Sequence, residues 1–381
     1  MNDALLVLNA GSSSLKFRLF AMAPDLPCVV GGKITDIGNR PTFRAHWYTP
    51  QTGEERSADE TQDLSVYADM NLAVTYILNW LSYYSKPWEI KACVHRVVHG
   101  GSDFDSATEL DSQTVDDLSA LNSLAPQHQP HNLAAVKAMW TQNPHLRQFA
   151  CFDTAFHAHH DRLHHEFALS ARLRARGLRR HGFHGLSYGW IAHRLKCDHP
   201  HLSKGKVVAA HLGNGASLCA MMNGRSIDTT MGMTVLDGLP MGTRCGAIDP
   251  GAILYMQQNL RMPIEDVADA LYNESGLKGL SGISNDMKTL LASDAPRAAF
   301  AVDYFALKAA QQIAAMAVSL GGMDALVFTG GIGENAAPVR DKILDRLAFL
   351  APFETLVIAA NEERQMATEV YRNYFQAAVP A

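Results

Sequence analysis

Apolar runs of strand length alternate with helix-like segments through the first half of the chain. The strand-like runs lie at residues 4–10, 15–20, 90–98 and 146–152, with shorter candidates inside 28–49. Two segments, 60–82 and 131–141, have apolar residues at the spacing of a helix face. Strands that alternate with helices predict an α/β architecture.

The second half of the chain begins the same pattern again. Residues 206–224 predict a strand, a glycine-rich turn and a second strand, as residues 5–20 do, and in both turns a glycine followed by serine or asparagine precedes a further serine. This short internal repeat favours two similar domains. Further on, residues 302–320 predict a helix that ends at Gly321, and a strand, DALVF, leads into TGGIGEN and an amphipathic helix near 338–348.

Three glycine-containing turns, within residues 7–17, 211–215 and 329–335, are candidates for phosphate binding. In VLNAGSSSLKF, residues 7–17, the turn is longer than a simple hairpin needs and is rich in hydroxyl and backbone N–H groups, which suit phosphate oxygens. It lacks the GxxxxGK[ST] spacing of a Walker A loop, and an ordinary turn remains the alternative. TGGIGEN, residues 329–335, leads from a strand to a helix N-terminus, which suits a phosphate or ribose but is also typical of a tight connection. If all three loops hold one nucleotide, they require a cleft between two similar domains.

Length and charge limit the class of protein. A chain of 381 residues favours two domains, expected at 1–153, completed by about 364–381, and at 154–363. The formal net charge of −5 gives no sign of a nucleic-acid surface. None of the six cysteines forms a CxxC pair, which indicates buried, reduced thiols and a cytoplasmic protein. No apolar run is long enough to span a membrane.

Four residues stand where phosphoryl-transfer chemistry would need them. Arg96 and Arg244 carry guanidinium forks that match phosphate oxygens, although each is also compatible with an ordinary surface arginine. Asp153 follows a strand, where a carboxylate faces the ligand crevice of an α/β sheet or caps a turn. His184, in RRHGFHG, could donate to a developing negative charge or be structural.

The histidine-rich segment HAHHDRLHHEF, residues 157–167, invites a metal interpretation. His157, His160 and His164 are three and four residues apart, so they could share one helix face. The segment has no HExxH motif and no acidic residue at ligand spacing. A solvated helix is therefore the favoured interpretation.

The order of eight motifs resembles that of the acetate kinases over residues 5 to about 367. The motifs are VLNAGSSSLKF, CVHRVVHGG, LAPQHQPHNL, FDTAFH, RRHGFHG, HLGNGAS, MGTRCGAIDPG and TGGIGEN. The resemblance implies two duplicated ribonuclease H-like domains, the fold of sugar kinases, actin and heat-shock ATPases, with an interdomain active-site cleft. It also implies reversible transfer of a phosphoryl group from ATP to acetate with Mg²⁺, giving acetyl phosphate and ADP, in a homodimer.

The resemblance also implies roles for individual residues. Asn9 and Glu362 would hold the metal, Arg96 would bind the carboxylate, and Asp153 would act as acid/base or positioning residue. His184 and Arg244 would stabilise the transition state with help from His128, and Val98, Gln127, Phe183 and Val235 would line the acyl site. The residues implied to bind nucleotide are Lys16, His211, Leu212, Gly213, Asn214, Gly215, Asp286, Met287, Lys288, Gly331, Ile332, Gly333, Glu334 and Asn335.

Several positions depart from the pattern of the resembled family. Gln127 replaces an apolar residue, Gln129 an asparagine and Val235 a proline, so propionate or another short carboxylate is an alternative to acetate. Lys288 stands where arginine is usual, which leaves the nucleotide preference open. Leu186 and Tyr188 stand where threonine and histidine are common. A non-catalytic ATP-binding module of the actin type is the competing class, but it would not need the arginine and histidine set.

Overall fold

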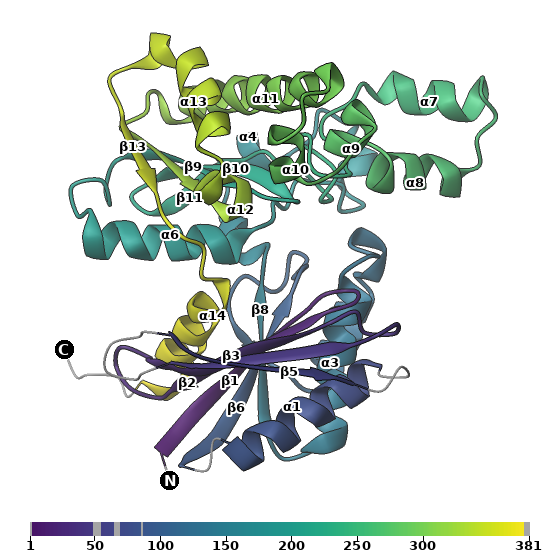
Figure 1. The fold of residues 1–381 in the computed structure, drawn as a ribbon. Coiled ribbons are helices and arrows are strands. Elements are labelled where there is room, and N and C mark those ends of the chain that lie inside the picture. The colour runs from purple at the N-terminus through teal and green to yellow at the C-terminus, as the bar shows by residue number, and fades with distance from the viewer. Residues whose placement is uncertain (1, 49–54, 65–68, 85–86, 377–381) are drawn as a thin grey trace. The chain divides into compact units, whose positions relative to one another are not determined.

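A computed structural model describes residues 2–48, 55–64, 69–84 and 87–376 (Figure 1). The chain forms two compact units. Unit 1 comprises Met1–Ala155 with Asn361–Ala381, and unit 2 comprises Phe156–Ala360. The expected boundaries lay two or three residues away from these.

Unit 1 contains a sheet of eight strands in the order β5-β4-β3-β2-β1-β6-β8-β7. The strands are β1 (Asn2–Ala10), β2 (Leu15–Ala21), β3 (Cys28–Thr35), β4 (Thr42–Tyr48), β5 (Glu55–Asp63), β6 (Trp88–Val97), β7 (Thr108–Glu109) and β8 (Arg147–Phe152). The helices are α1 (Met70–Tyr84), α2 (Ser112–Ser119), α3 (Gln129–Gln142) and α14 (Glu362–Val370), with a π-helical segment at Tyr371–Phe375.

Alternation along β1 builds the core of unit 1. Leu6 and Leu8 point to the face that α1 and α3 cover, where they pack with Phe17 of β2 and with Ile77 and Trp80 of α1. Helix α14 contacts β1, β6 and β8, and it lies on the opposite face of the sheet (Figure 1). With both faces covered, the central strands are apolar on both sides, which explains why residues 4–8 form an unbroken apolar run.

Unit 2 contains a sheet of five strands in the order β11-β10-β9-β12-β13. The strands are β9 (Lys206–Leu212), β10 (Ala216–Met222), β11 (Arg225–Thr229), β12 (Ala325–Thr329) and β13 (Glu354–Val357). The helices are α4 (Arg162–His165), α5 (Ala171–Arg174), α6 (Gly185–Asp198), α7 (Pro250–Gln258), α8 (Ile264–Asn273), α9 (Gly276–Ser281), α10 (Met287–Leu291), α11 (Pro296–Leu320), α12 (Gly330–Asn335) and α13 (Ala337–Arg346). Helix α6 packs on one face of this sheet and α11 on the other (Figure 1).

The two sheets repeat one topology, so the predicted duplication is confirmed. In unit 1, β2 pairs antiparallel with β1 and β3, and β6 runs parallel to both β1 and β8. In unit 2, β10 pairs antiparallel with β9 and β11, and β12 runs parallel to both β9 and β13. The carboxyl ends of the parallel strands therefore lie side by side in each sheet.

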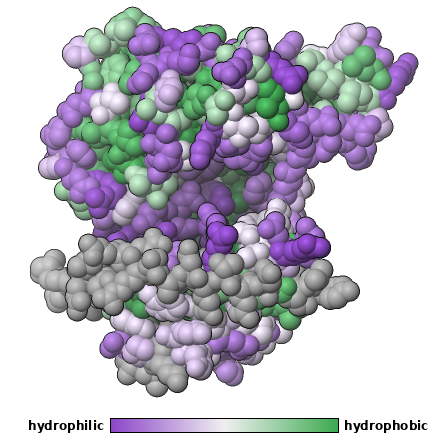
Figure 2. Space-filling model, in the orientation of Figure 1, coloured by the Kyte–Doolittle hydropathy of each residue, from purple (hydrophilic) through white to green (hydrophobic). Residues whose placement is uncertain are grey.

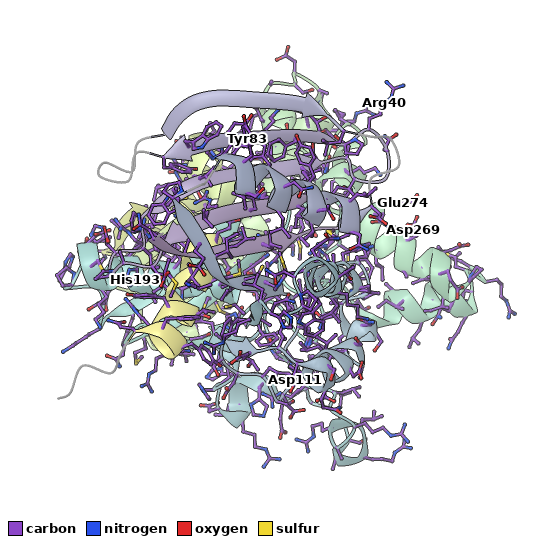
Figure 3. All side chains as sticks on the ribbon, turned by 90° about the horizontal axis from the view of Figure 1, so that it is seen from below. Arg40, Tyr83, Asp111, His193, Asp269 and Glu274 are labelled. Carbon is purple, nitrogen blue, oxygen red and sulfur yellow. The ribbon has the colours of Figure 1, made fainter. Side chains whose placement is uncertain are left out.

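Helices α7 and α8 extend from unit 2 as an arm (Figure 1). No residue of α7 is buried although its sequence is PGAILYMQQ. Figure 2 shows hydrophobic side chains over α7 among hydrophilic ones. The arm also carries the exposed Asp269 and Glu274, which are labelled in Figure 3. The exposed large apolar residues of residues 248–264 are Ile248, Leu254, Tyr255, Leu260 and Ile264.

Two expectations from sequence were wrong in part. The predicted helix 60–82 begins only at Met70, because residues up to Asp63 form the edge strand β5; residues 65–68 lie outside the described ranges. The six cysteines all lie in described ranges and are free thiols, but Cys197 is exposed and Cys28 and Cys245 are half-buried rather than buried. Within the described residues, none of the helices combines the length and apolar character required to cross a bilayer.

Two amides at the start of α3 hold the carboxyl edge of the sheet in unit 1. The Asn132 amide donates to Ala10 O at 2.7 Å, at the end of β1, and its Oδ1 accepts from Val98 N at 3.0 Å, just after β6. Gln129 accepts from His99 N at 3.0 Å and donates to His99 O at 2.9 Å. Both side chains are buried, so these bonds satisfy backbone groups that would otherwise lack partners.

We expect Asn132→Ala to lower the free energy of unfolding of unit 1 by about 2–4 kcal/mol, because two buried backbone groups lose their partners. The measurement is urea unfolding at neutral pH. Asn71→Ala is the matched control, since Asn71 lies on α1 of the same unit and is exposed. Equal unfolding midpoints for the two variants would show that Asn132 does not hold the edge.

Candidate active site

The carboxyl edge of unit 1 brings together three of the expected residues. Asn9 stands one residue before the end of β1, Arg96 one residue before the end of β6, and Asp153 just after β8. Because β1, β6 and β8 are parallel neighbours, the three side chains converge. The Arg96 guanidinium reaches Asn9 Oδ1 at 3.5 Å.

Arg96 and Asp153 form a two-point ion pair. Arg96 Nε donates to Asp153 Oδ1 at 3.0 Å, and Nη2 donates to Oδ2 at 2.5 Å. Asp153 is 2% exposed, so its charge depends on this partner. Burial works against the charged guanidinium, but Asp153, with Glu362 and Glu363, outweighs it and raises the pKa of Arg96.

Negative charge accumulates beside this pair at the start of α14. Burial raises the pKa of Glu362 to about 7, with Asp153 and Glu363 adding to the rise while Arg96 and Lys16 oppose it. Glu363 Oε1 accepts from the Asn9 amide at 3.3 Å. Lys16 is exposed and pairs with Asn9 across the β1–β2 hairpin. Carboxylates crowded enough to hold a proton near neutral pH mark a place where a cation would be favoured.

This donor set fits Mg²⁺ only in part. Asn9 and Glu362 supply the hard oxygen atoms that Mg²⁺ prefers. No group of three or more His, Cys, Asp and Glu side chains in the described ranges is arranged to hold a metal ion. Mg²⁺ commonly takes one or two protein oxygens together with water and substrate phosphates, and that incomplete mode is the one these residues match.

The expected acyl residues of unit 1 lie beside the same edge. Val98 is buried directly after β6, and Gln127 and His128 are half-buried just before α3. Gln129, the other departure from the family pattern, is buried and fully engaged with His99 and with Leu118 O at 3.2 Å. The Gln129 side chain therefore holds the backbone of His99 and Leu118 in place.

Two glycine segments converge at the carboxyl edge of unit 2. A Cβ built on Gly213, in the β9–β10 turn, would lie 3.8 Å from the backbone nitrogen of Gly331. Gly330 has φ +78°, and a Cβ there would lie 2.8 Å from Leu212 O, so only glycine suits this close approach. Around Gly331 nothing lies within 4 Å of a built Cβ, which leaves open space beside the loop.

The segment TGGIGEN is a short helix, α12, directly after β12, where a loop was expected. Glu334 Oε1 accepts from the backbone N–H groups of Gly330 and Ala360, both at 2.9 Å. The Asn335 amide donates to Gly331 O at 2.9 Å. These two side chains hold the turn together, while Ile332 and Gly333 are buried and Gly331 is exposed.

The segment Asp286–Lys288 begins helix α10. Asp286 is its N-cap and accepts from Thr289 N at 2.9 Å. Met287 is buried, whereas Asp286 and Lys288 are exposed, so these two residues present their side chains to solvent. The preceding Asn285 donates to Asn214 Oδ1 at 3.1 Å, which ties this segment to the β9–β10 turn.

His184 and Arg244 meet on one side of that turn. A Cβ on Gly215 would lie 3.3 Å from His184 Nε2 and 3.8 Å from Arg244 Nη1. His184 has φ +58°, a left-handed conformation that is uncommon outside glycine and concentrates at functional sites. Arg244 Nη1 donates to the carbonyl oxygen of Val235 at 3.3 Å, and both Val235 and Phe183 are buried.

The expected solvated helix over residues 157–167 was wrong. Only Arg162–His165 is α-helical, His157 ends a 3-10 turn, and both His157 and His160 are buried. His157 Nδ1 lies 2.7 Å from Ser226 Oγ, and His160 Nε2 lies 2.6 Å from the same oxygen. Burial lowers the pKa of His157 to about 4 and that of His160 to about 3, so both rings are neutral at pH 7.

Sequence reasoning assigned no role to Ser217 or to the buried Tyr188, and it did not find Asn132. These residues contact expected site residues, or the backbone of the site, that lie far from them in sequence. An example is the 2.8 Å hydrogen bond between Ser217 Oγ and His184 Nδ1. The one available signal was that Tyr188 departs from the family pattern next to a predicted site residue.

Known proteins match the chain over nearly its full length. A family model described as the Acetokinase family matches residues 4–372. Acetate kinase of Rhodopseudomonas palustris (strain TIE-1) is 45% identical over 356 residues, covering 92% of this chain and 87% of the relative. Acetate kinase of Rhizobium meliloti is 44% identical over 361 residues, covering 94% and 90%.

Solved structures agree with this match. A propionate kinase from Francisella tularensis subsp. tularensis SCHU S4 has a TM-score of 0.87 at 32% identity, covering 96% of this chain and 98% of the other. Porphyromonas gingivalis acetate kinase has a TM-score of 0.82 at 30% identity, again covering 96% and 98%. The resemblance drawn from the eight motifs and the duplicated α/β fold are both confirmed, and the chain belongs to the acetokinase family.

Proposed function

We propose that this protein transfers the γ-phosphoryl group of ATP to acetate in one reversible step, giving acetyl phosphate and ADP. The observation that carries the proposal is the Arg96–Asp153 pair at the carboxyl edge of β6 and β8, which holds a guanidinium ready for an anionic acceptor. Family membership supports the same reaction.

Asp153 acts as a positioning residue and not as a general base. The acetate carboxylate is ionised at pH 7, since free carboxyl groups titrate near ~4, so its oxygen needs no base to attack phosphorus. Both carboxylate oxygens of Asp153 accept hydrogen bonds from Arg96. Asp153 therefore orients the guanidinium, and Arg96 binds the acceptor carboxylate.

Unit 2 binds the nucleotide and stabilises the transferring group. The loop His211–Gly215 and the segment Gly331–Asn335 form the phosphate side, supported by the approach of Gly213 to Gly331. His184 and Arg244 donate to the equatorial oxygens, where charge is distributed in phosphoryl transfer. The reaction requires Lys16, Arg96 and His128 of unit 1 to act on the same reactants, with no covalent enzyme intermediate.

Asn9 and Glu362 would hold Mg²⁺, each through a side-chain oxygen. When bound, the ion neutralises phosphate charge, which is the usual contribution of Mg²⁺ in phosphoryl transfer. Glu362 is suited to this, because burial, and then the negative neighbours Asp153 and Glu363, raise its pKa and disfavour its ionised form in the absence of a cation.

A short aliphatic acid fits the acyl residues best. Val98, Phe183 and Val235 are buried and apolar, while the half-buried Gln127 can turn its amide to solvent. We propose acetate as the substrate and propionate as the alternative. The likeness to a propionate kinase from Francisella tularensis is the reason for keeping propionate as that alternative.

The free thiols and the buried Cys93, Cys151 and Cys219 favour a reducing compartment, and we place the protein in the cytoplasm. Fractionation of cells that express the native protein tests this, and recovery outside the cytoplasmic fraction would contradict it.

We expect hydroxylamine trapping to detect acyl phosphate with ATP, Mg²⁺ and acetate, and a smaller signal with propionate. Butyrate and hydroxy-acids complete the panel, and kcat/KM for each acid is the measured quantity. A clear preference for a polar acid would contradict the acetate assignment, and no acyl phosphate with any acid would contradict the proposed reaction.

We expect Arg244→Leu to lower kcat for acetyl phosphate formation by about a hundredfold or more, the scale of losing one charge-stabilising donor. Arg225→Leu, at an exposed position of β11, is the matched control and should keep its activity. Circular dichroism establishes that both variants fold. A folded Arg244→Leu variant with near-native kcat would remove Arg244 from the mechanism.

We also propose that the protein is a homodimer whose interface includes the α7–α8 arm. Its exposed apolar side chains, Leu254 and Tyr255 among them, are the type that a second copy buries. Light scattering should give twice the chain mass for the native protein. A Leu254→Glu, Tyr255→Glu double variant should be monomeric, whereas Leu163→Glu, at an exposed position of α4, should stay dimeric. A native monomer, or a dimeric double variant, would contradict this proposal.

A further inference from the structure

We propose that Tyr188 and Ser217 are positioning residues that orient the His184 ring and place its proton on Nε2. The inference rests on the transition-state role proposed above for His184. It assigns a function to the tyrosine that departs from the family pattern.

The three side chains form a continuous chain of hydrogen bonds in unit 2. Tyr188 Oη lies 2.5 Å from Ser217 Oγ, and Ser217 Oγ lies 2.8 Å from His184 Nδ1. Tyr188 and Ser217 are each 0% exposed, so water does not compete for these bonds. Tyr188 lies in the first turn of α6 and Ser217 in β10, so two regular elements hold the chain in place.

The surroundings of Tyr188 set the direction of these bonds. Burial raises the pKa of Tyr188 well above its ordinary value, with the charge of Cys219 adding to the rise, so the phenol keeps its proton. The hydrogen bond between the phenol and Ser217, and the one from the His211 backbone, lower the pKa of Tyr188 but do not outweigh burial. A buried phenol that accepts the backbone N–H of His211 uses its own O–H to donate to Ser217, and Ser217 then donates to His184 Nδ1.

The reverse direction would leave a buried donor without a partner. If His184 Nδ1 carried the proton, it would donate to Ser217, and Ser217 would donate to Tyr188. The phenol O–H would then need another acceptor, and none is found in the described part of the chain. An unsatisfied buried hydroxyl costs about 1–3 kcal/mol, which disfavours this arrangement.

A second contact from the same helical turn holds the face of the His184 ring. The rings of His184 and His211 stack with centroids 4.4 Å apart and planes 24° apart. Ser187 Oγ lies 2.9 Å from His211 Nδ1. The first turn of α6 therefore fixes His184 through Ser217 at its edge and through His211 at its face.

This arrangement directs an N–H donor towards the glycine turn. With Nδ1 accepting from Ser217, a neutral His184 carries its proton on Nε2. That nitrogen lies 3.3 Å from where a Cβ of Gly215 would stand, on the same side as Arg244 Nη1. A pre-oriented neutral donor can stabilise charge that develops on a phosphoryl oxygen without moving during the reaction.

Two readouts test the proposal, the protonation site of His184 and the steady-state constants of the full-length protein. ¹⁵N NMR of protein labelled at histidine, with the His184 signals assigned by their loss in His184→Asn, should show a proton on Nε2 and none on Nδ1. Tyr188→Phe, which removes only the hydroxyl, should shift His184 towards the Nδ1–H form and lower kcat about tenfold, the factor for one hydrogen bond. KM for ATP and for acetate should change less than about twofold, because the lost contact acts in the transition state.

Ser217→Ala should change both readouts in the same direction, and it decides the question if Tyr188→Phe does not fold. The double variant should be no worse than Ser217→Ala alone, because the two residues act in series. Tyr374→Phe is the matched control: its hydroxyl donates to Ala107 O at 2.9 Å in unit 1, and its loss should move neither readout. An Nδ1–H form in the native protein, or an unchanged tautomer and kcat in both Tyr188→Phe and Ser217→Ala, would overturn the proposal.

The two readouts also separate this proposal from the proposed function. The tautomer of His184 can be measured without turnover. A native protein that makes no acyl phosphate but shows the Nε2–H form and its loss in Tyr188→Phe would refute the reaction and keep the hydrogen-bond chain. An active protein with the opposite tautomer would do the reverse.

Discussion

Parallel pairing of strands at the centre of each sheet is the constraint from which the sites follow. In unit 1, β1, β6 and β8 run in one direction, so the residues at their carboxyl ends are neighbours however far apart they lie in sequence. In unit 2, β9, β12 and β13 repeat this arrangement. Each first strand turns back through a glycine-containing hairpin, and this places an N–H-rich turn beside the same edge.

Charge compensation determines which groups can occupy the edge of unit 1. Arg96 and Asp153 are largely removed from water, and each is tolerable because the other is present. Burial, with the charges of Asp153 and Glu363, raises the pKa of Glu362 to about 7. A further cation would therefore be favoured beside this edge, and phosphoryl transfer between two anions has the same electrostatic requirement.

Much of this arrangement could be predicted from sequence because it depends on local patterns. The strands around Asn9, Arg96 and His211 and the duplicated hairpins follow from apolar runs and glycine positions. Strand β5 could not be found in this way, because ERSADETQD lacks apolar alternation and pairs only as an edge. The burial of His157 and His160 likewise depends on Ser226, 69 and 66 residues away, so helical spacing within the segment carried no information about it. The contact of Tyr188 with Ser217 spans 29 residues and needs both α6 and β10 in place.

The proposed function requires the glycine turns of both units to act on one nucleotide. A crystal structure with a non-hydrolysable ATP analogue, Mg²⁺ and acetate tests this most directly. We predict phosphate density against the Gly213–Gly215 turn and Gly331, with the Asn9–Lys16 hairpin and Arg96 contacting the terminal phosphate and the acetate. Nucleotide density away from the Gly213–Gly215 turn, or phosphates that contact only one of the two hairpins, would contradict the account.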